Sequence, residues 1–232
     1  MLNTLIFTGG VIIYQPFPRK SILLLCSSVN YHYEIPHLMI TNFNSCSEAG
    51  QDRFVFQLLV RPGNRLDGSF LDIGACNPIR KSNTYALERL GWSGWLVERN
   101  WPLVELLSKQ RTSTVVHADA TKVDWSFLPI SVDYLSLDVD RDTLAVLRTL
   151  PLTRVEFKII TIEHDAYAYR DGNKLRGPER EALTAAGYCL ICGNVAVVPG
   201  KPFEDWWVHL SLAARAERFK CHGKYWKNIF TA

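Results

Sequence analysis

Short apolar runs alternate with amphipathic stretches along the chain from about residue 46 to its end. Apolar runs bounded by turn residues predict buried strands, which we expect at 68–74, 94–98, 114–117, 132–138, 155–163, 188–198 and 206–212. The amphipathic stretches between them predict helices at 82–90, 101–109, 142–150 and 178–186. Strands that alternate with helices indicate βαβ units, so the predicted fold is α/β, with a mainly parallel, doubly wound sheet.

Residues 1–45 lack this regular alternation and are rich in β-branched and aromatic residues, with prolines at positions 16, 18 and 36. We interpret them as an N-terminal extension with one or two strands, or as a leader segment, and residues 46–232 as one domain. The apolar runs of the extension are shorter than the ~20 residues that cross a bilayer, and no basic segment precedes the first of them. We therefore predict no membrane span and no targeting segment.

The composition is that of an ordinary globular protein: of 232 residues, 47% are apolar and 21% are charged. This excludes a disordered chain, a coiled coil and a collagen-like fibre. A net charge of +3 implies neither nucleic-acid nor membrane partners by itself. The six cysteines do not form the dense framework of a small secreted protein, so we predict reduced thiols and a cytoplasmic location. Cys189 and Cys192 form a C-x-x-C pair inside an apolar run, which favours core cysteines over a metal or redox site.

Acidic residues stand at or just past the ends of five successive predicted strands. In a doubly wound sheet, ligands bind outside the carboxyl ends of the strands, so these positions are candidates for a binding site. A cap or a turn explains each acid separately but explains the series poorly. The strand-end acids are Asp72, Glu98, Asp119, Asp138 and Glu163, with Asp140, His164 and Asp165 close behind.

The turn after the first of these strands, residues 72–78, lacks the G-x-G-x-x-G sequence that brings a pyrophosphate to a helix N-terminus. This weakens a nicotinamide or flavin interpretation, although Gly74 still permits the close approach of a ligand without phosphates. Glu98 ends the next strand, where a carboxylate can accept both ribose hydroxyls of an adenosine. The alternative for Glu98 is a surface acid paired with Arg99 or another neighbour.

Seven sequence blocks, in order, resemble those of FkbM-type S-adenosylmethionine (SAM)-dependent methyltransferases, and they cover roughly residues 46–210. The blocks are 47–54, 70–78, 82–88, 91–98, 133–140, 162–167 and 203–208. Cys76 and Asn77 depart from the pattern, because many relatives have an acid there. The resemblance implies a class I methyltransferase fold, which is Rossmann-like, with helices on both faces of a seven-stranded sheet whose last strand runs antiparallel.

The resemblance also implies where SAM would lie, over the ends of the first strands. Asp72 and Gly74 would form the floor near the methionine and ribose, and Glu98 would bind the ribose hydroxyls. The other implied contacts are Asp119 and Ala120 beside the adenine, Gln51, Asp52 and Asn83 at the methionine end, and Asp138 facing the methyl group.

Methyl transfer to a hydroxyl requires that the hydroxyl lose its proton, and two routes fit this sequence. In the first, Glu163 or His164 takes the proton as a base. In the second, the carboxylates of Asp138, Asp140 and Glu163, with Asp165 as a further ligand, hold Mg²⁺, which lowers the pKa of the hydroxyl. In a third interpretation, these acids are only caps and ion-pair partners.

Three functions follow as alternatives. The first is O-methylation of a sugar or another small hydroxylated acceptor. The second is methylation of RNA at a ribose 2′-hydroxyl; against it, the strand ends carry no clear lysine-centred group, and Lys158 lies within a predicted strand. The third is a binding or scaffold protein without activity on a methyltransferase fold, against which the series of strand-end acids argues.

Overall fold

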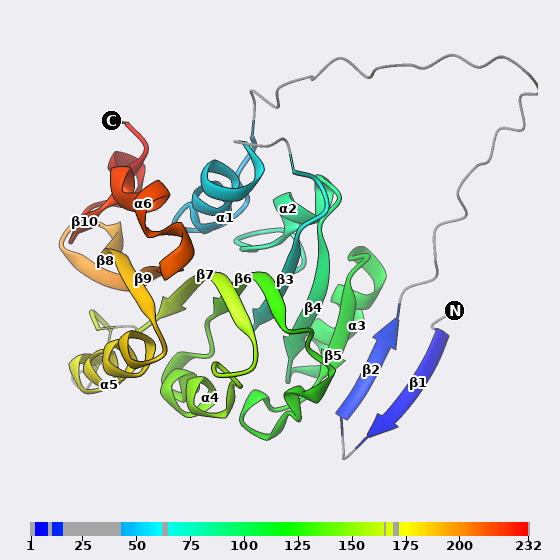
Figure 1. The fold of residues 1–232 in the computed structure, drawn as a ribbon. Helices are drawn as coiled ribbons and strands as arrows, with labels where there is room; N and C mark the ends of the chain where they lie inside the picture. The colour runs from blue at the N-terminus through cyan, green and yellow to red at the C-terminus, as the bar shows by residue number, and fades with distance from the viewer. Residues whose placement is uncertain are drawn as a thin grey trace, which may run out of the picture.

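The structure, a computed structural model, describes residues 3–8, 11–15, 43–61, 65–164, 166–168 and 172–231. Its strands form one sheet in the order β1-β2-β5-β4-β3-β6-β7-β9-β8-β10 (Figure 1). The strands are β1 (Asn3–Thr8), β2 (Val11–Gln15), β3 (Ser69–Ile73), β4 (Ser93–Glu98), β5 (Thr114–His117), β6 (Ser131–Leu137), β7 (Glu156–Glu163), β8 (Tyr188–Val198), β9 (Lys201–His209) and β10 (Cys221–His222).

The strands β5, β4, β3, β6 and β7 run parallel to one another, and β9 pairs antiparallel with both β7 and β8. This arrangement confirms the predicted doubly wound sheet, including its antiparallel last long strand. The strand order reverses at β3, because the chain moves first to β4 and β5 and later to β6 and β7. The crevice at such a reversal is where ligands bind in open α/β sheets.

The sheet is wider than the seven strands of the prediction. β1 and β2 form a hairpin that pairs antiparallel with β5, and β10 pairs parallel with β8. The predicted break at Gly193 is wrong, because β8 runs on as one strand with shifts in its register to β9. β9 spans Lys201–His209 rather than 206–212, because its polar residues Glu204 and Asp205 also pair with β7.

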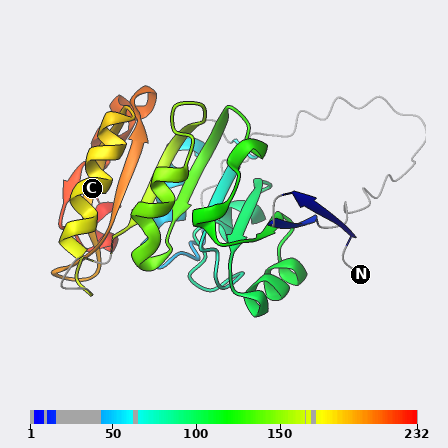
Figure 2. The same ribbon diagram turned by 90° about the horizontal axis from the view of Figure 1, so that it is seen from below.

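Helices cover both faces of the sheet, as predicted. α4 and α5 pack on one face, whereas α1, α2, α3 and α6 contribute to the hydrophobic cluster on the other (Figure 2). In the part of the chain that the structure describes, no helix combines the length and the apolar character needed to cross a membrane. The helices are α1 (Gln51–Val55), α2 (Tyr85–Arg89), α3 (Trp101–Gln110), α4 (Thr143–Thr149), α5 (Gly172–Ala185) and α6 (Ala213–Ala216).

Two helices begin at least three residues from their predicted starts. α2 begins at Tyr85 rather than Ser82, but Ser82 Oγ accepts the backbone N–H of Tyr85 (3.2 Å) and therefore caps the helix from outside it. α5 begins at Gly172, so Pro178 lies inside the helix instead of starting it. Proline is favoured in the first turn of a helix, and this preference misplaced the predicted start.

Candidate functional site

Two adjoining cavities open at the carboxyl ends of the central strands. The larger has a volume of about 490 Å³, and its walls come from the ends of β4, β5, β6 and β7 and the residues that follow them. The smaller, of about 240 Å³, lies between the turn after β3 and the start of α1. The two cavities share the lining residues Glu48, Gly74, Cys76, Lys81, Asp138 and Phe203.

The turn after β3 lies very close to the end of β6. Gly74 has a φ of 85°, and a Cβ at this position would lie 1.7 Å from the carbonyl oxygen of Asp138. The backbone N–H groups of Gly74 and Ala75 both donate to the carbonyl oxygen of Val97 (2.9 and 3.2 Å). The turn therefore requires glycine, and its first N–H groups are used within the protein rather than directed at an anion.

Glu98 lies at the end of β4, where its carboxylate is buried and lines the larger cavity. Its Oε2 accepts the N–H of Cys76 (3.0 Å), and its Oε1 accepts the N–H of Asn100 (2.7 Å). Each carboxylate oxygen has two acceptor positions, so one on each oxygen is left for a ligand. Arg99 pairs instead with Asp142 (3.4 Å), which contradicts the alternative of a surface pair between Glu98 and Arg99.

Asp119 and Ala120 line the larger cavity just past the end of β5. Asp119 Oδ1 accepts the N–H and the hydroxyl of Thr121 (3.1 and 2.7 Å), and these bonds lower the pKa of Asp119. The adjacent walls are apolar and can flank a flat ring; they are formed by Val97, Leu103, Ala118, Val139 and Val146.

The smaller cavity is lined by four of the residues predicted to bind the cofactor, Gln51, Asp72, Gly74 and Asn83. Asp72 is buried, its Oδ2 accepts the hydroxyl of Thr84 (2.6 Å), and burial raises its pKa. Asn83 donates to Ser136 Oγ (2.9 Å), but its buried Oδ1 has no hydrogen-bond partner among the described residues. Gln51 lines the cavity while its amide accepts from Ala49 and donates to a carboxylate.

Asp52, also predicted at the methionine end, lies outside both cavities. Its buried carboxylate accepts hydrogen bonds from the hydroxyls of Ser45 and Ser47 (2.5 and 2.6 Å) and from the backbone N–H of Cys46 (2.7 Å). Asp52 therefore holds the segment that leads into α1.

Asp138, Asp140 and Glu163 line the larger cavity, but they do not form the predicted magnesium site. Among the described residues, no group of three or more carboxylate, histidine or cysteine side chains is placed to hold a metal ion. The predicted further ligand, Asp165, lies outside the described residues. The order of these acids along the chain suggested a cluster, but the structure does not make them converge.

His164 is buried and lines neither cavity. Its Nδ1 accepts the N–H of Ala166 (3.2 Å), and its Nε2 lies 3.5 Å from Asp205 Oδ1. Burial acts to raise the pKa of Asp205, but its hydrogen bonds, first those from Arg180 and then that from the N–H of Asn194, outweigh it and lower that pKa to about 2. The structure therefore does not bring the imidazole to the cavity, contrary to its predicted role as a base.

Several wall residues were not assigned a role from the sequence. Lys81 and Glu48 form an ion pair (2.7 Å) where the two cavities meet. Tyr167 and Phe203 line the larger cavity with their ring centroids 6.2 Å apart. Glu48, Tyr167 and Phe203 fall in sequence blocks that resemble the FkbM family, whereas Lys81 does not. Only the folded chain brings these four residues together.

The charge of the larger cavity is strongly biased. Seven acidic side chains line it, against the two basic side chains of Lys81 and Arg99. Carboxylates in a cleft favour positively charged ligands and disfavour phosphates. The cavity therefore suits a ligand that carries positive charge together with hydroxyl groups.

Comparisons with known proteins support the fold. No family model matches the chain, and a search of curated proteins finds no match. A TehB-like SAM-dependent methyltransferase from Corynebacterium glutamicum is 14% identical with a TM-score of 0.50, over 72% of this chain and 89% of that one. A proposed O-methyltransferase from Klebsiella pneumoniae is 15% identical with a TM-score of 0.51, over 69% and 80%. A proposed rRNA methylase from Clostridium thermocellum is 12% identical with a TM-score of 0.50, over 71% and 98%.

At these identities the likeness shows the fold: the chain has the Rossmann-like class I methyltransferase fold. The strand order and the antiparallel β9 agree with this assignment. Membership of the FkbM family stays a prediction.

Proposed function

We propose that the chain is a SAM-dependent methyltransferase that methylates a hydroxyl of a small acceptor. The observation that carries the proposal is Glu98, a buried carboxylate held by two backbone N–H groups at the reversal of strand order. It lies in an acid-lined cavity next to a turn whose first N–H groups are already bonded. This chemistry suits an adenosine without a pyrophosphate. The solved structures described as methyltransferases have the same fold.

The lining residues fit the chemical groups of SAM. SAM supplies an electrophilic methyl group on a positively charged sulfonium. Glu98 would accept the ribose hydroxyls, and Asp119 and Ala120 would border the adenine. The orphaned Oδ1 of Asn83 would accept from the methionine ammonium in the smaller cavity, with Gln51, Asp72 and Gly74 around it.

The acceptor would bind where the larger cavity meets the ends of β6 and β7. Asp138 and Glu163 line this part, and either carboxylate is placed to take the proton of an acceptor hydroxyl. Tyr167 and Phe203 offer ring faces to an apolar or sugar-like surface. The wall can thus hold the hydroxyl in line with the methyl group, which is the main requirement of this reaction.

His164 would act as a positioning residue rather than as a base. Because Nδ1 accepts the N–H of Ala166, the imidazole fixes the turn that carries Tyr167 into the cavity. The other ring nitrogen lies 3.5 Å from Oδ1 of Asp205, which is itself held by Arg180 (2.7 Å). The base that takes the proton of the acceptor hydroxyl would then be the carboxylate of Asp138 or of Glu163.

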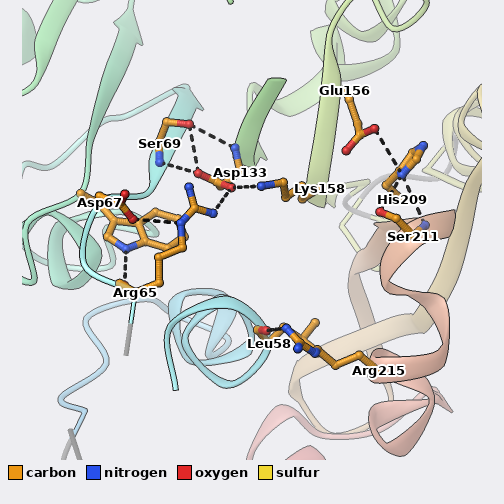
Figure 3. Close-up of polar contacts among 11 residues, drawn as sticks. Leu58, Arg65, Asp67, Ser69, Asp133, Glu156, Lys158, His209, Ser211 and Arg215 are labelled. Carbon is orange, nitrogen blue, oxygen red and sulfur yellow. Dashed lines mark hydrogen bonds and ion pairs between the residues drawn. The ribbon is translucent and has the colours of Figure 1, made fainter. Parts of the chain in front are cut away.

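An RNA acceptor has less support than a small hydroxylated one. The seven acids around the larger cavity would repel a phosphate backbone. Lys158 lies near the start of β7, where it donates to Asp133 Oδ1 (2.7 Å) in a cluster with Arg65 (Figure 3). This lysine is at the amino edge of the sheet, away from the cavities. We also propose a cytoplasmic location, on the ground that the six cysteines of the sequence do not form the dense framework of a small secreted protein.

Isothermal titration with S-adenosylhomocysteine tests the proposal, with NAD⁺ as a phosphate-bearing comparison. We expect the wild-type protein to bind S-adenosylhomocysteine and not NAD⁺. Glu98→Gln removes a charged acceptor and should weaken binding about 10–100-fold. Asp142→Asn removes a charge from the same cavity at a position paired with Arg99, so its affinity should change by less than about 3-fold.

Folding of each variant is checked by its thermal midpoint and circular dichroism. A folded wild-type protein that does not bind S-adenosylhomocysteine, or that binds NAD⁺ equally well, would contradict the proposal and favour a scaffold or a different ligand. Equal weakening by Glu98→Gln and Asp142→Asn would show that overall charge, rather than a bond to the ribose, determines affinity.

A further inference from the structure

Cys192 and Cys221 lie side by side at the β8–β10 edge of the sheet. β10 pairs parallel with β8 in a register that sets Cys221 opposite Cys192. Neighbouring strands lie about 4.8 Å apart, within the ~4.4–6.8 Å that separates the Cα atoms of disulfide-bonded cysteines. Both side chains also contact the same hydrophobic cluster, so they project to the same face of the sheet. The backbone therefore brings the two thiols within bonding range.

The two thiols differ in exposure and in acidity. Cys192 is buried, and its Sγ donates to the carbonyl oxygen of Phe219 (3.0 Å). Cys221 is half-buried, and the neighbouring Cys192 thiol lowers its pKa, with a further contribution from Lys224, against the effect of burial. An accessible thiol of lowered pKa beside a second thiol is the arrangement found in redox-sensitive cysteine pairs.

We propose that Cys221 and Cys192 form a redox-modification site, at which a peroxide oxidises Cys221 and Cys192 converts the product to a disulfide. The Cys221 thiolate attacks one peroxide oxygen, the O–O bond breaks, and the released hydroxide takes a proton to become water. The sulfur of Cys192 then attacks the sulfenic acid of Cys221. The S–S bond forms, the S–O bond breaks, and the oxygen leaves as a second water with the proton of Cys192. Two electrons pass from the thiol pair to the peroxide.

The disulfide would fasten the C-terminal segment to the rest of the molecule. Beyond β10, the rings of Trp226 and Phe230 pack against Gly50, where a Cβ would lie 2.8 and 3.0 Å from them. Gly50 directly precedes α1, whose first residue, Gln51, lines the smaller cavity. Joining Cys192 to Cys221 restricts the unfolded chain and holds this packing in place. The proposal does not depend on methyltransferase activity.

The test uses the reduced full-length protein, hydrogen peroxide, and mass spectrometry after alkylation of the remaining thiols. We expect the wild-type protein to lose about 2 Da and to give a peptide pair that joins Cys192 to Cys221. Its thermal midpoint should rise by about 5 °C or more, and dithiothreitol should reverse both changes. Cys189→Ser removes a nearby thiol on β8 and should behave like the wild type.

Variants of the pair separate the two steps. Cys192→Ala should stop the reaction at a sulfenic acid on Cys221, which dimedone traps, whereas Cys221→Ser should give neither the adduct nor the disulfide. Because Cys221 is half-buried, we expect Cys221→Ser to keep the fold. If Cys192→Ala unfolds, Cys221→Ser still tests whether oxidation begins at Cys221. A first oxidation at another cysteine, or loss of the Cys221 thiol no faster than that of Cys189, would overturn the proposal.

Discussion

Glu179 on α5 carries a buried carboxyl whose protonation should link stability to pH. Its side chain is 2% exposed, and its Oε1 has no hydrogen-bond partner among the described residues. Burial raises the pKa of Glu179 to about 8, with a further contribution from the negative charge of Asp205 and an opposing one from Arg180. Between the ordinary carboxyl pKa and this value, the folded protein binds a proton that the unfolded chain does not. The free energy of unfolding should therefore fall as the pH rises.

The size of this effect follows from the pKa difference. One proton of difference changes the free energy of unfolding by about 1.4 kcal/mol per pH unit. With a folded pKa of about 8, the loss between about pH 6 and about pH 8 is roughly 2 kcal/mol for Glu179. Burial also raises the pKa of Glu204 to about 8, which adds a loss of similar size. The sum is a large share of the ~5–15 kcal/mol that stabilises a typical domain.

Urea unfolding followed by circular dichroism at about pH 6, 7 and 8 measures this loss. Glu179→Gln keeps the shape of the neutral carboxyl but cannot ionise, so the variant should lose about half as much stability as the wild type over this range. Glu217→Gln is the control, because Glu217 is exposed and, among the described residues, forms an ion pair with the exposed Lys220. A wild-type stability that is flat or rises with pH, or a Glu179→Gln slope equal to that of the wild type, would refute the reasoning.

Three further substitutions test other parts of the structure. Gly74→Ala places a Cβ 1.7 Å from a backbone oxygen at a positive φ, so it should cost more than about 2 kcal/mol, whereas Gly177→Ala meets nothing within 4 Å and should be neutral or stabilising by urea unfolding. Arg111→Met leaves the acid of a buried ion pair unpaired and should cost about 3–5 kcal/mol, whereas Lys122→Met at an exposed pair should cost less than about 1 kcal/mol. His164→Ala should leave the affinity for S-adenosylhomocysteine within about 2-fold, while the backbone amide that donates to His164 exchanges its hydrogen faster. Loss of that affinity without faster exchange would contradict the positioning role.

The central sheet could be predicted because its signals are local. The run that became β5, Thr114–His117, is apolar, short and bounded by turn residues, and its bounds match the prediction. β10 could not be predicted, because it has only two residues and exists through its pairing with Cys192 and Gly193 of β8. The start of α5 was missed for a related reason. A local preference of proline for the first turn outweighed the weaker helical signal of residues 172–177.

Some residues of the candidate site could be predicted from the local sequence, whereas others are brought together only by the fold. Glu98 could be found from its place at a strand end, because the carboxyl ends of parallel strands meet at one edge of the sheet. Glu163 and His164 are adjacent where a strand ends, and adjacent side chains there point in opposite directions. If Glu163 faces the cavity, His164 must face the interior on the other side, as it does. The alternation of side chains along a strand therefore predicts this arrangement, whereas the distances between acids on separate strand ends depend on the whole fold.

The chemistry of the turn after β3 links the fold to the kind of ligand that it can hold. Dinucleotide-binding folds use the same crevice but direct the N–H groups of this turn at a pyrophosphate. Here the N–H groups of Gly74 and Ala75 donate to Val97, and that of Cys76 donates to Glu98. Glu98 therefore has two effects: it consumes a donor that a phosphate would need, and it places a negative charge where a phosphate would lie. We therefore propose that a cavity built in this way selects an adenosine by its hydroxyls and favours positive charge beyond them, which is the combination that a sulfonium cofactor presents.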